Sequence, residues 1–425
     1  MKVLWICNVP IPEAKDVMGD ETEVRVSWLV GISEALRKEV ELYVAYFSNN
    51  SENIRTGTGN QVTFVAIPRH KRVNQYDEEL ATQIRQVYEQ IRPDVVHVFG
   101  TEFPHTLSAI KAAEICGIEN KTVVSIQGLV SVCGQRYLAS LPQWVCNYYT
   151  VRDVLRHCNI KQAQKEFLAR GRYEIQAIEC AHHVIGRTDW DKACTTMINP
   201  KIQYHFNNEI LRTTFYEQKW DYGKCEPYRI FMSQGGVPYK GFHFALQALA
   251  LLKKKYPSVK LCITERDFVH PTGFKEKIRL NSYQYYLRKL ILDNDLVENV
   301  CFLGTLNESE MCEQYLKANV YILPSVIENS PNSLGEAMLV GTPAVSADVG
   351  GVKNMMKHRE EGLVYPHDDY YMLASYIDEI FAMRDEARII SEAARQHAMQ
   401  IFDVESNIKS LKQIYNDISE VKSGE

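Results

Sequence analysis

The sequence lacks the features that mark membrane-spanning, disulfide-rich and nucleic-acid-binding proteins. Its longest apolar runs, such as "DVVHVFG" and "ANVYILPSV", fall well short of the roughly 20 residues that cross a bilayer. Its 11 cysteines include no Cys-x-x-Cys pair, which argues against a disulfide framework and a zinc site. Its formal net charge of -5 provides no overall attraction to nucleic acid, so none is expected as a partner.

A secretory signal is also missing from the N-terminus. The opening "MKVLWICNVPIPEAKD" has a single lysine before a short apolar run, and then proline and acidic residues, a pattern typical of a first strand. Together with cysteines that suggest reduced thiols, this pattern predicts an uncleaved, cytoplasmic protein.

What the chain does contain is a regular alternation of short apolar runs with longer helical patterns. This alternation is typical of parallel sheets covered by helices. In the first half, strands are expected at 2–7, 40–47, 61–67, 94–100, 121–128 and 182–188, with helices at 24–38, 78–92 and 104–116. After an irregular stretch, a second series of strands is expected at 229–236, 259–264, 299–304, 319–325 and 342–348.

The two series predict the domain organisation. A chain of 425 residues is too long for one ordinary core. We therefore expect an α/β protein of two Rossmann-like, doubly wound domains that face an interdomain cleft, since such sheets bind ligands beyond the carboxyl ends of their strands. The expected bounds are 1–205 for the N-terminal domain, 206–400 for the C-terminal domain and 401–425 for a final helix that packs back on the first domain.

The stretch "IENSPNSLGEAMLVG" places Glu328 and Glu336 on either side of an expected helix start. Ser330 suits the N-cap and Pro331 the first helical position. Backbone amides at the start of such a helix point outward and favour an anion such as phosphate. The amides concerned would be those of Asn332, Ser333 and Leu334.

An ordinary capping box is the alternative for part of this pattern. With Ser333 as the N-cap, Glu336 would lie three residues later and could close the box. That reading leaves Glu328 unexplained, because it precedes the helix in a loop after a strand, where functional residues gather.

The wider context of the two glutamates resembles a known signature. A Glu, seven residues and a second Glu, followed by "AMLVGTPAVSADVGG", is similar to the donor site of retaining family 4 glycosyltransferases (glycosyl transferases group 1), which have the GT-B fold. "SQGGVPYKGFHFALQAL" resembles their first phosphate loop, "NVCFLG" their base-proximal strand and "EGLVYPHDD" the segment after the donor helix. In the first half, "RPDVVHVFG" and "VVSIQGLV" are looser matches.

The resemblance implies a role for each residue of the second domain's motifs. Glu336 would bind the nucleotide ribose, and Glu328 would face the hydroxyls of the donor sugar. Lys240 would neutralise the diphosphate, assisted by the amides of Ser333 and Leu334, because negative charge grows on this leaving group. Further expected donor-binding positions are Asn332, Gly235, Gly304 and, in the first domain, Gly19.

The first domain offers weaker candidates. His105 follows the strand at 94–100 and is expected to act on the acceptor side, whereas His97 within that strand is expected to be a core histidine. Arg187 could face the cleft or form a surface salt bridge. The family often has Arg at the position of Gly235 and His at the position of Gln127.

The resemblance implies that the chain transfers a sugar, with retention, from a nucleotide diphosphate sugar to a hydroxyl of a glycan or lipid-linked acceptor. Cell-surface or capsular polysaccharide synthesis is the expected context, and no metal or other cofactor is expected. A weaker alternative is a metal-dependent glycosyltransferase of another fold, in which the Asp-x-Asp strings at 189–191 and 293–295 would hold magnesium. A sugar-nucleotide epimerase and a non-catalytic nucleotide-sugar-binding protein remain alternatives.

A basic stretch at 158–176, with Trp144, Tyr148 and Tyr149 close in sequence, could contact an anionic membrane from the cytoplasmic side. A solvated charged face is the alternative.

Overall fold

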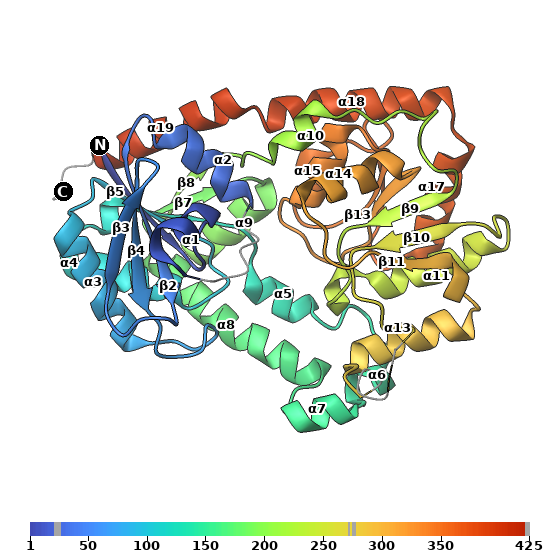
Figure 1. Ribbon diagram of the computed structural model, residues 1–425, viewed down its shortest axis with the longest axis horizontal. Helices are drawn as coiled ribbons and strands as arrows, with labels where there is room; N and C mark the ends of the chain where they lie inside the picture. Colours follow the sequence, from blue (N-terminus) through green and yellow to red (C-terminus); the bar gives the residue numbers. More distant parts are fainter. Residues whose placement is uncertain (21–26, 271–272, 274–277, 421–425) are drawn as a thin grey trace. The chain divides into compact units, whose positions relative to one another are not determined.

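The computed structural model describes residues 1–20, 27–270, 273 and 278–420. By their internal contacts these residues form two compact units (Figure 1). The first unit comprises Met1–Ser131, Phe167–Arg212 and the chain from Phe402 on; the second comprises Val132–Glu166 and Thr213–Ile401. Each unit is built on its own parallel sheet, which confirms the predicted α/β class with two Rossmann-like domains.

The sheet of the first unit has eight strands in the described residues, in the order β3-β4-β2-β1-β5-β6-β7-β8. All neighbouring strands are parallel except β3 and β4, which are antiparallel. The strands are β1 (Lys2–Cys7), β2 (Glu41–Ser48), β3 (Arg55–Gly59), β4 (Val62–Pro68), β5 (Val95–Phe99), β6 (Thr122–Ser125), β7 (His183–Gly186) and β8 (Gln203–Phe206).

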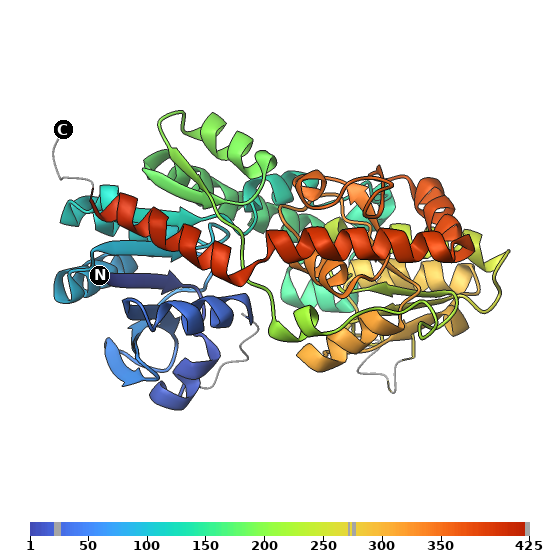
Figure 2. The same cartoon turned by 90° about the horizontal axis from the view of Figure 1, so that it is seen from above.

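Helices accompany these strands. They are α1 (Pro12–Met18), α2 (Ser27–Leu36), α3 (Glu78–Ile91), α4 (His105–Cys116), the short η1 (Glu119–Lys121), α8 (Ile160–Cys180), α9 (Asp189–Ile198) and α19 (Val404–Ser419). Figure 2 shows α19, in red, running alongside this unit, and α19 contacts β5 and α2. The core of the first unit is therefore completed by the last described helix of the chain.

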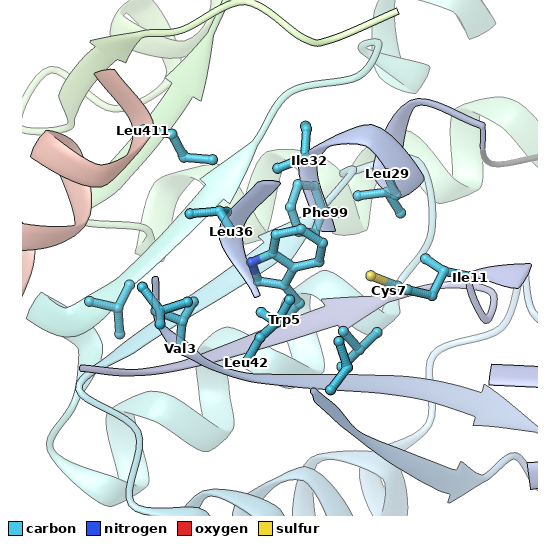
Figure 3. Close-up of a cluster of buried hydrophobic side chains, with 14 of the residues drawn as sticks. Val3, Trp5, Cys7, Ile11, Leu29, Ile32, Leu36, Leu42, Phe99 and Leu411 are labelled. Carbon is cyan, nitrogen blue, oxygen red and sulfur yellow. The ribbon is translucent and has the colours of Figure 1, made fainter. Parts of the chain in front are cut away.

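The core of the first unit surrounds Trp5, which is fully buried on β1 (Figure 3). Its ring meets Phe99 edge-on, with 5.0 Å between centroids. Leu411 and Tyr415 on α19 belong to the same cluster. Because β1 is covered on both faces, five of its six residues are buried, which explains why it reads as a continuous apolar run.

Polar groups inside this core are hydrogen-bonded to one another. The His97 Nδ1 lies 2.6 Å from the Tyr415 hydroxyl, and its Nε2 lies 2.6 Å from the Ser125 hydroxyl. The Trp5 indole N–H donates to the same Tyr415 hydroxyl at 3.1 Å. His97 is therefore a satisfied core histidine, as the sequence predicted.

This histidine predicts a pH dependence of stability. Burial lowers the pKa of His97 to about 3, from an ordinary 6.5, so its contribution is present above pH 6.5 and is lost as the pH falls. At pH 5 the unfolded chain gains about 2 kcal/mol from binding this proton. The destabilisation caused by His97→Gln, measured by urea unfolding, should therefore shrink by about 2 kcal/mol between pH 7.5 and 5.0. An unchanged difference would contradict a buried, neutral His97.

The sheet of the second unit has six parallel strands in the described residues, in the order β11-β10-β9-β12-β13-β14. The strands are β9 (Arg229–Met232), β10 (Lys260–Ile263), β11 (Val300–Phe302), β12 (Val320–Leu323), β13 (Ala344–Asp348) and β14 (Leu363–Pro366). From β9 the chain first builds β10 and β11 on one side, and it then returns to build β12, β13 and β14 on the other. The reversal between β9 and β12 is the point where open α/β sheets bind ligands.

Helices of the second unit connect these strands and fill its remaining segments. They are α5 (Val130–Arg136, which begins in the first unit), α6 (Gln143–Asn147), α7 (Val151–Arg156), α10 (Thr213–Glu217), η2 (Pro238–Lys240), α11 (Phe242–Lys253), α13 (Ser282–Asp293), η3 (Val297–Asn299), α14 (Glu308–Lys317), α15 (Asn332–Val340), α16 (Val352–Met355), α17 (Tyr370–Ala382) and α18 (Asp385–Ile401). The segment 132–166, which carries α6 and α7, groups with this unit, whereas the sequence assigned it to an N-terminal domain of 1–205. Within the described ranges, no helix combines the length and apolarity needed to cross a membrane.

Candidate functional site

The candidate site lies in the second unit, beyond the carboxyl ends of β9 and β12. A pocket there is lined by residues of both strand ends and by the start of α15. Those used below are Ser233, Lys240, Tyr321, Ser325 and Ser333. The pocket therefore occupies the reversal point of the sheet, where the topology predicts a ligand.

Two loops of this site are joined through their backbones. The Val326 N–H, after β12, donates to the Tyr239 carbonyl oxygen, after β9, at 2.9 Å. Gly241, which precedes α11, has φ +76°, and a Cβ on it would lie 1.9 Å from the Pro324 carbonyl oxygen. Only glycine satisfies both the backbone conformation and this close approach.

A third loop, after β13, supports the same region. Gly350 has φ +51°, and a Cβ on it would lie 1.7 Å from the Glu328 carbonyl oxygen. The neighbouring Gly351 N–H donates to the Asn329 carbonyl oxygen at 3.1 Å. The backbone of Glu328 is thus held in place by the turn that follows the adjacent strand.

Lys240 and Glu328 form an ion pair at this site. The Lys240 Nζ lies 2.6 Å from the Glu328 Oε1, and the two side chains are 20% and 10% exposed. The Ser325 hydroxyl donates to the same oxygen at 2.7 Å. The pair is half-buried and oriented, so it presents an ammonium group suited to an anion beside a carboxylate suited to hydroxyl groups.

Glu336 is buried within α15 and is contacted by a tyrosine from α14. The Tyr315 hydroxyl lies 3.1 Å from the Glu336 Oε2 and 3.0 Å from the Ser333 carbonyl oxygen. A second buried tyrosine, Tyr321, donates to the Ser333 hydroxyl at 2.8 Å. Burial raises the pKa of Tyr321, and the charges of Glu328 and Glu336 add to that rise, so its hydroxyl stays protonated.

The start of α15 differs from both predicted capping arrangements. The helix begins at Asn332, and Pro331 occupies the N-cap without a side-chain cap. Ser330 is not the N-cap; its hydroxyl donates to the Met355 sulfur at 3.5 Å. Because Ser333 lies inside the helix, the Ser333–Glu336 capping box is also wrong. The Leu334 N–H donates to the Pro331 carbonyl oxygen at 2.9 Å, so this amide is already engaged.

Two predicted donor-binding glycines are organised by a residue that the sequence did not reveal, Glu265. The Gly235 N–H donates to the Glu265 carboxylate at 3.0 Å, and the Gly304 N–H donates to its carbonyl oxygen at 3.1 Å. A Cβ on Gly235 would lie 2.6 Å from the Ile263 side chain. This packing explains why glycine stands where the family often has arginine. The sequence feature that could have identified Glu265 is its position just after a buried strand.

The remaining predicted residues, His105 and Gly19, lie in the first unit. His105 is the first residue of α4 and is buried against Phe47, with ring centroids 5.3 Å apart. Burial, with a smaller contribution from the Arg69 charge, lowers the pKa of His105 to about 3, so the ring is neutral at pH 7. Gly19 is the left-handed C-cap of α1, with φ +70°, and its N–H donates to the Lys15 carbonyl oxygen.

The first unit has a small cavity of its own at the carboxyl ends of β5, β6 and β7, with both apolar and polar residues in its lining. Its lining includes Gln127, Arg187 and Glu209. The Arg187 guanidinium pairs with the Glu209 carboxylate at 3.0 Å, and both side chains are buried. Arg187 is therefore in a buried ion pair and not in a surface salt bridge. It also donates to the Gln127 carbonyl oxygen at 3.3 Å.

Glu102, next to the end of β5, is a further titratable group that the sequence reasoning missed. Burial raises its pKa to about 7, and the charge of Glu174 adds to the rise. A raised carboxylate pKa of this kind is common among proton-transfer groups. The sequence feature that could have identified it is its position in the loop after a buried strand, three residues beyond the end of β5.

The two Asp-x-Asp strings serve as local structural contacts. Asp191 completes the capping box of α9 with Thr188. Asp293 pairs with Lys289 at the end of α13, and Asp295 pairs with Lys253. Across the described part of the chain, no group of three or more His, Cys, Asp or Glu side chains is arranged to hold a metal ion.

Comparison with known sequences finds a family model that matches most of the second unit. The family model described as Glycosyl transferases group 1 matches residues 215–397. The amylovoran biosynthesis glycosyltransferase AmsK from Erwinia amylovora is 26% identical over 158 residues, which are 36% of this chain and 35% of that protein. Alignments to this and two other curated relatives span 35% to 41% of the lengths of those proteins.

Comparison with solved structures covers nearly the whole chain. Sucrose-phosphate synthase from Thermosynechococcus elongatus aligns with a TM-score of 0.70 and 17% identity over 99% of both chains. Anabaena HepE in complex with UDP-glucose aligns with a TM-score of 0.66 and 16% identity over 98% of this chain and 100% of that one. At such identities the likeness concerns the fold. Residues 215–397 are therefore similar to the glycosyl transferases group 1, and the chain has the GT-B fold.

Proposed function

We propose that this chain transfers a sugar, with retention of anomeric configuration, from a nucleotide diphosphate sugar to a hydroxyl of a glycan or lipid-linked acceptor. The observation that carries this proposal is the pocket at the reversal point of the second sheet, where Lys240, Glu328 and the start of α15 meet. The UDP-glucose complex of HepE and the amylovoran role of AmsK support this donor class and a role in cell-surface or capsular polysaccharide synthesis.

The proposed donor spans the two glutamates. The diphosphate lies against the Lys240 ammonium and the positive end of the α15 dipole, near Asn332 and the Ser333 amide. The Glu328 carboxylate accepts hydrogen bonds from hydroxyls of the donor sugar, and the Glu336 carboxylate accepts them from the ribose hydroxyls. Glu336 is buried, so the ribose must displace or join the Tyr315 contact on that carboxylate.

Gly235 and Gly304 leave room for a ligand at the edge of this site. Both are held by Glu265 and carry no side chain into the loops that follow β9 and β11. We assign these loops to the nucleotide end of the donor. The first unit is assigned to the acceptor, with the neutral His105 as a hydrogen-bonding group and Gly19 in an adjoining loop.

The proposed chemistry is a front-side displacement. The bond between the anomeric carbon and the diphosphate oxygen breaks as the acceptor oxygen bonds to the same face of that carbon. The departing phosphate oxygen accepts the acceptor's proton, so the products are a glycoside and a protonated nucleoside diphosphate. Lys240 stabilises the charge that grows on the leaving group. The mechanism uses no metal or other cofactor and takes place in the cytoplasm.

The test is a panel of UDP-, GDP- and ADP-sugars titrated into the full chain by calorimetry, followed by product analysis with oligosaccharide and lipid-linked acceptors. One nucleotide class should bind at least tenfold more tightly than the others, and NMR should show a product with the anomeric configuration of the donor. Conversion of the donor without any acceptor would instead identify an epimerase. Donor binding without transfer or hydrolysis would identify a non-catalytic binding protein, and an inverted product would overturn the retaining mechanism.

A further inference from the structure

The second unit presents a cluster of exposed apolar side chains on a short, basic segment. The largest exposures are those of Leu155, at 73%, and Val154, at 57%, both on α7. We call the cluster the α7 platform; it consists of Trp144, Tyr148, Tyr149, Val151, Val154 and Leu155. Single exposed apolar residues are common, but six of them within 12 positions of one segment mark a candidate interaction surface.

The segment that carries the platform is anchored to the helix beside it. Figure 1 shows α6 and α7 next to α13. The fully buried Asp153 of α7 accepts a hydrogen bond from the Ser282 N–H, the first residue of α13, at 2.9 Å. The Tyr148 ring stacks on Tyr285 with 4.7 Å between centroids. The inward face of α7 is therefore anchored, and its apolar residues face outward as a consequence of the fold.

The charge around the platform is opposite to that of the whole chain. Residues 132–166 carry five Lys or Arg and two Asp or Glu, a net charge of +3, in a chain whose formal net charge is -5. Arg152 and Arg156 lie on α7 itself, between and beside the exposed aliphatic residues. Asp153 is buried and pairs with Arg152 at 3.5 Å, whereas Arg156 is exposed.

This combination fits one kind of partner. Exposed Leu and Val suit the boundary of the acyl chains, Trp and Tyr suit the interface with the head groups, and Arg and Lys suit anionic head groups. We propose that the α7 platform docks the protein on the surface of an anionic phospholipid bilayer. The platform shares Trp144, Tyr148 and Tyr149 with the surface considered from the sequence. It is centred on α7 and not on the 158–176 stretch, where Arg170 stacks on the Phe167 ring at 4.2 Å.

The proposal is tested by flotation of the full chain with vesicles, which reads binding and is independent of sugar transfer. Vesicles of phosphatidylcholine with 30% phosphatidylglycerol, about one anionic lipid in three, should bind at least tenfold more protein than phosphatidylcholine alone. Binding should fall as salt is raised from 0.05 to about 0.5 M, because salt screens the attraction. Arg156→Gln should weaken binding about fivefold, the effect of one basic residue near such a surface.

The matched variants separate the platform from general surface hydrophobicity. Val154→Ser combined with Leu155→Ser should reduce vesicle binding at least tenfold. Ile389→Ser on α18, at a position 68% exposed, should leave it unchanged. All of these positions are exposed, so thermal unfolding should stay near that of the parent chain.

Three results would overturn the proposal. One is the absence of binding to anionic vesicles, and a second is equal binding by the double variant. The third is a dimer in sedimentation without lipid that the double variant converts to a monomer, which would make the platform an interface between copies of the chain.

Discussion

Replacing Lys240 by Ala should reduce the rate of sugar transfer at least a hundredfold, equivalent to about 3 kcal/mol of transition-state stabilisation. The substitution removes the cation beside the proposed diphosphate and leaves Glu328, only 10% exposed, with the Ser325 hydroxyl but without its ion-pair partner. The unpaired carboxylate would then repel the diphosphate. Rate and donor affinity should both fall, measured as nucleoside diphosphate release and by calorimetry.

Two further variants make this result specific. Lys353→Ala removes an exposed ion pair with Asp348 after a neighbouring strand, so it should leave the rate within about twofold of the parent chain. Glu336→Gln should keep the fold, because Gln can still accept the Tyr315 hydrogen bond. It should weaken donor binding, because the amide accepts the ribose hydroxyls less strongly than a carboxylate does. Near-normal turnover in Lys240→Ala would refute the assignment of this pocket.

Replacing Gly241 by Ala should strongly lower the unfolding temperature of the second unit. Among glycine-to-alanine changes in the site, only the one at Gly350 should lower it more. The new Cβ would lie 1.9 Å from the Pro324 carbonyl oxygen, which is backbone and cannot rotate away. The two loops would have to separate and break the hydrogen bond from Val326 to Tyr239. We expect a loss of about 3–5 kcal/mol from this clash and from strain at positive φ, and loss of donor binding.

Gly304→Ala is the matched control for this variant. Gly304 has nearly the same conformation, with φ +70°, and among the described residues no neighbouring heavy atom lies within 4 Å of an added Cβ. It should therefore cost only the backbone strain, about 1–2 kcal/mol. Both variants can be compared by scanning calorimetry, which resolves units that unfold separately. Equal shifts for the two variants would show that the loops do not touch as closely as the structure indicates.

The sequence predicted those strands that are covered on both faces. Such strands are continuous apolar runs, and β1, β5 and β12 were recognised within one or two residues. The edge strand β11 was also predicted, at 299–304, whereas both edge strands of the first sheet were missed. Their sequences carry no such signal: β3 reads "RTGTG" and β8 reads "QYHF", with partly or fully exposed residues. The first is antiparallel and the second pairs on one side only, so burial did not shape their composition.

The sequence named the charged residues of the candidate site but not the residues that hold them in place. A resemblance named Lys240 and Glu328, and the structure brings their charged groups together across 88 positions of sequence. Tyr315, Tyr321 and Glu265 were not found, because a buried tyrosine resembles any core aromatic and a glutamate after a strand resembles a solvated loop residue. Their roles depend on which strands are neighbours, a property that local sequence does not encode.

The position of α19 has a consequence for how the protein is made. The first unit begins at the N-terminus, yet its core includes Tyr415, whose hydroxyl bonds the Trp5 indole across 410 positions. During synthesis the ribosome must finish the entire second unit before this contact can form. Domains usually fold on the ribosome in order from the N-terminus. Here part of the apolar surface of the first unit stays uncovered until α19 has been synthesised. The second unit is therefore complete in sequence before the core of the first unit is.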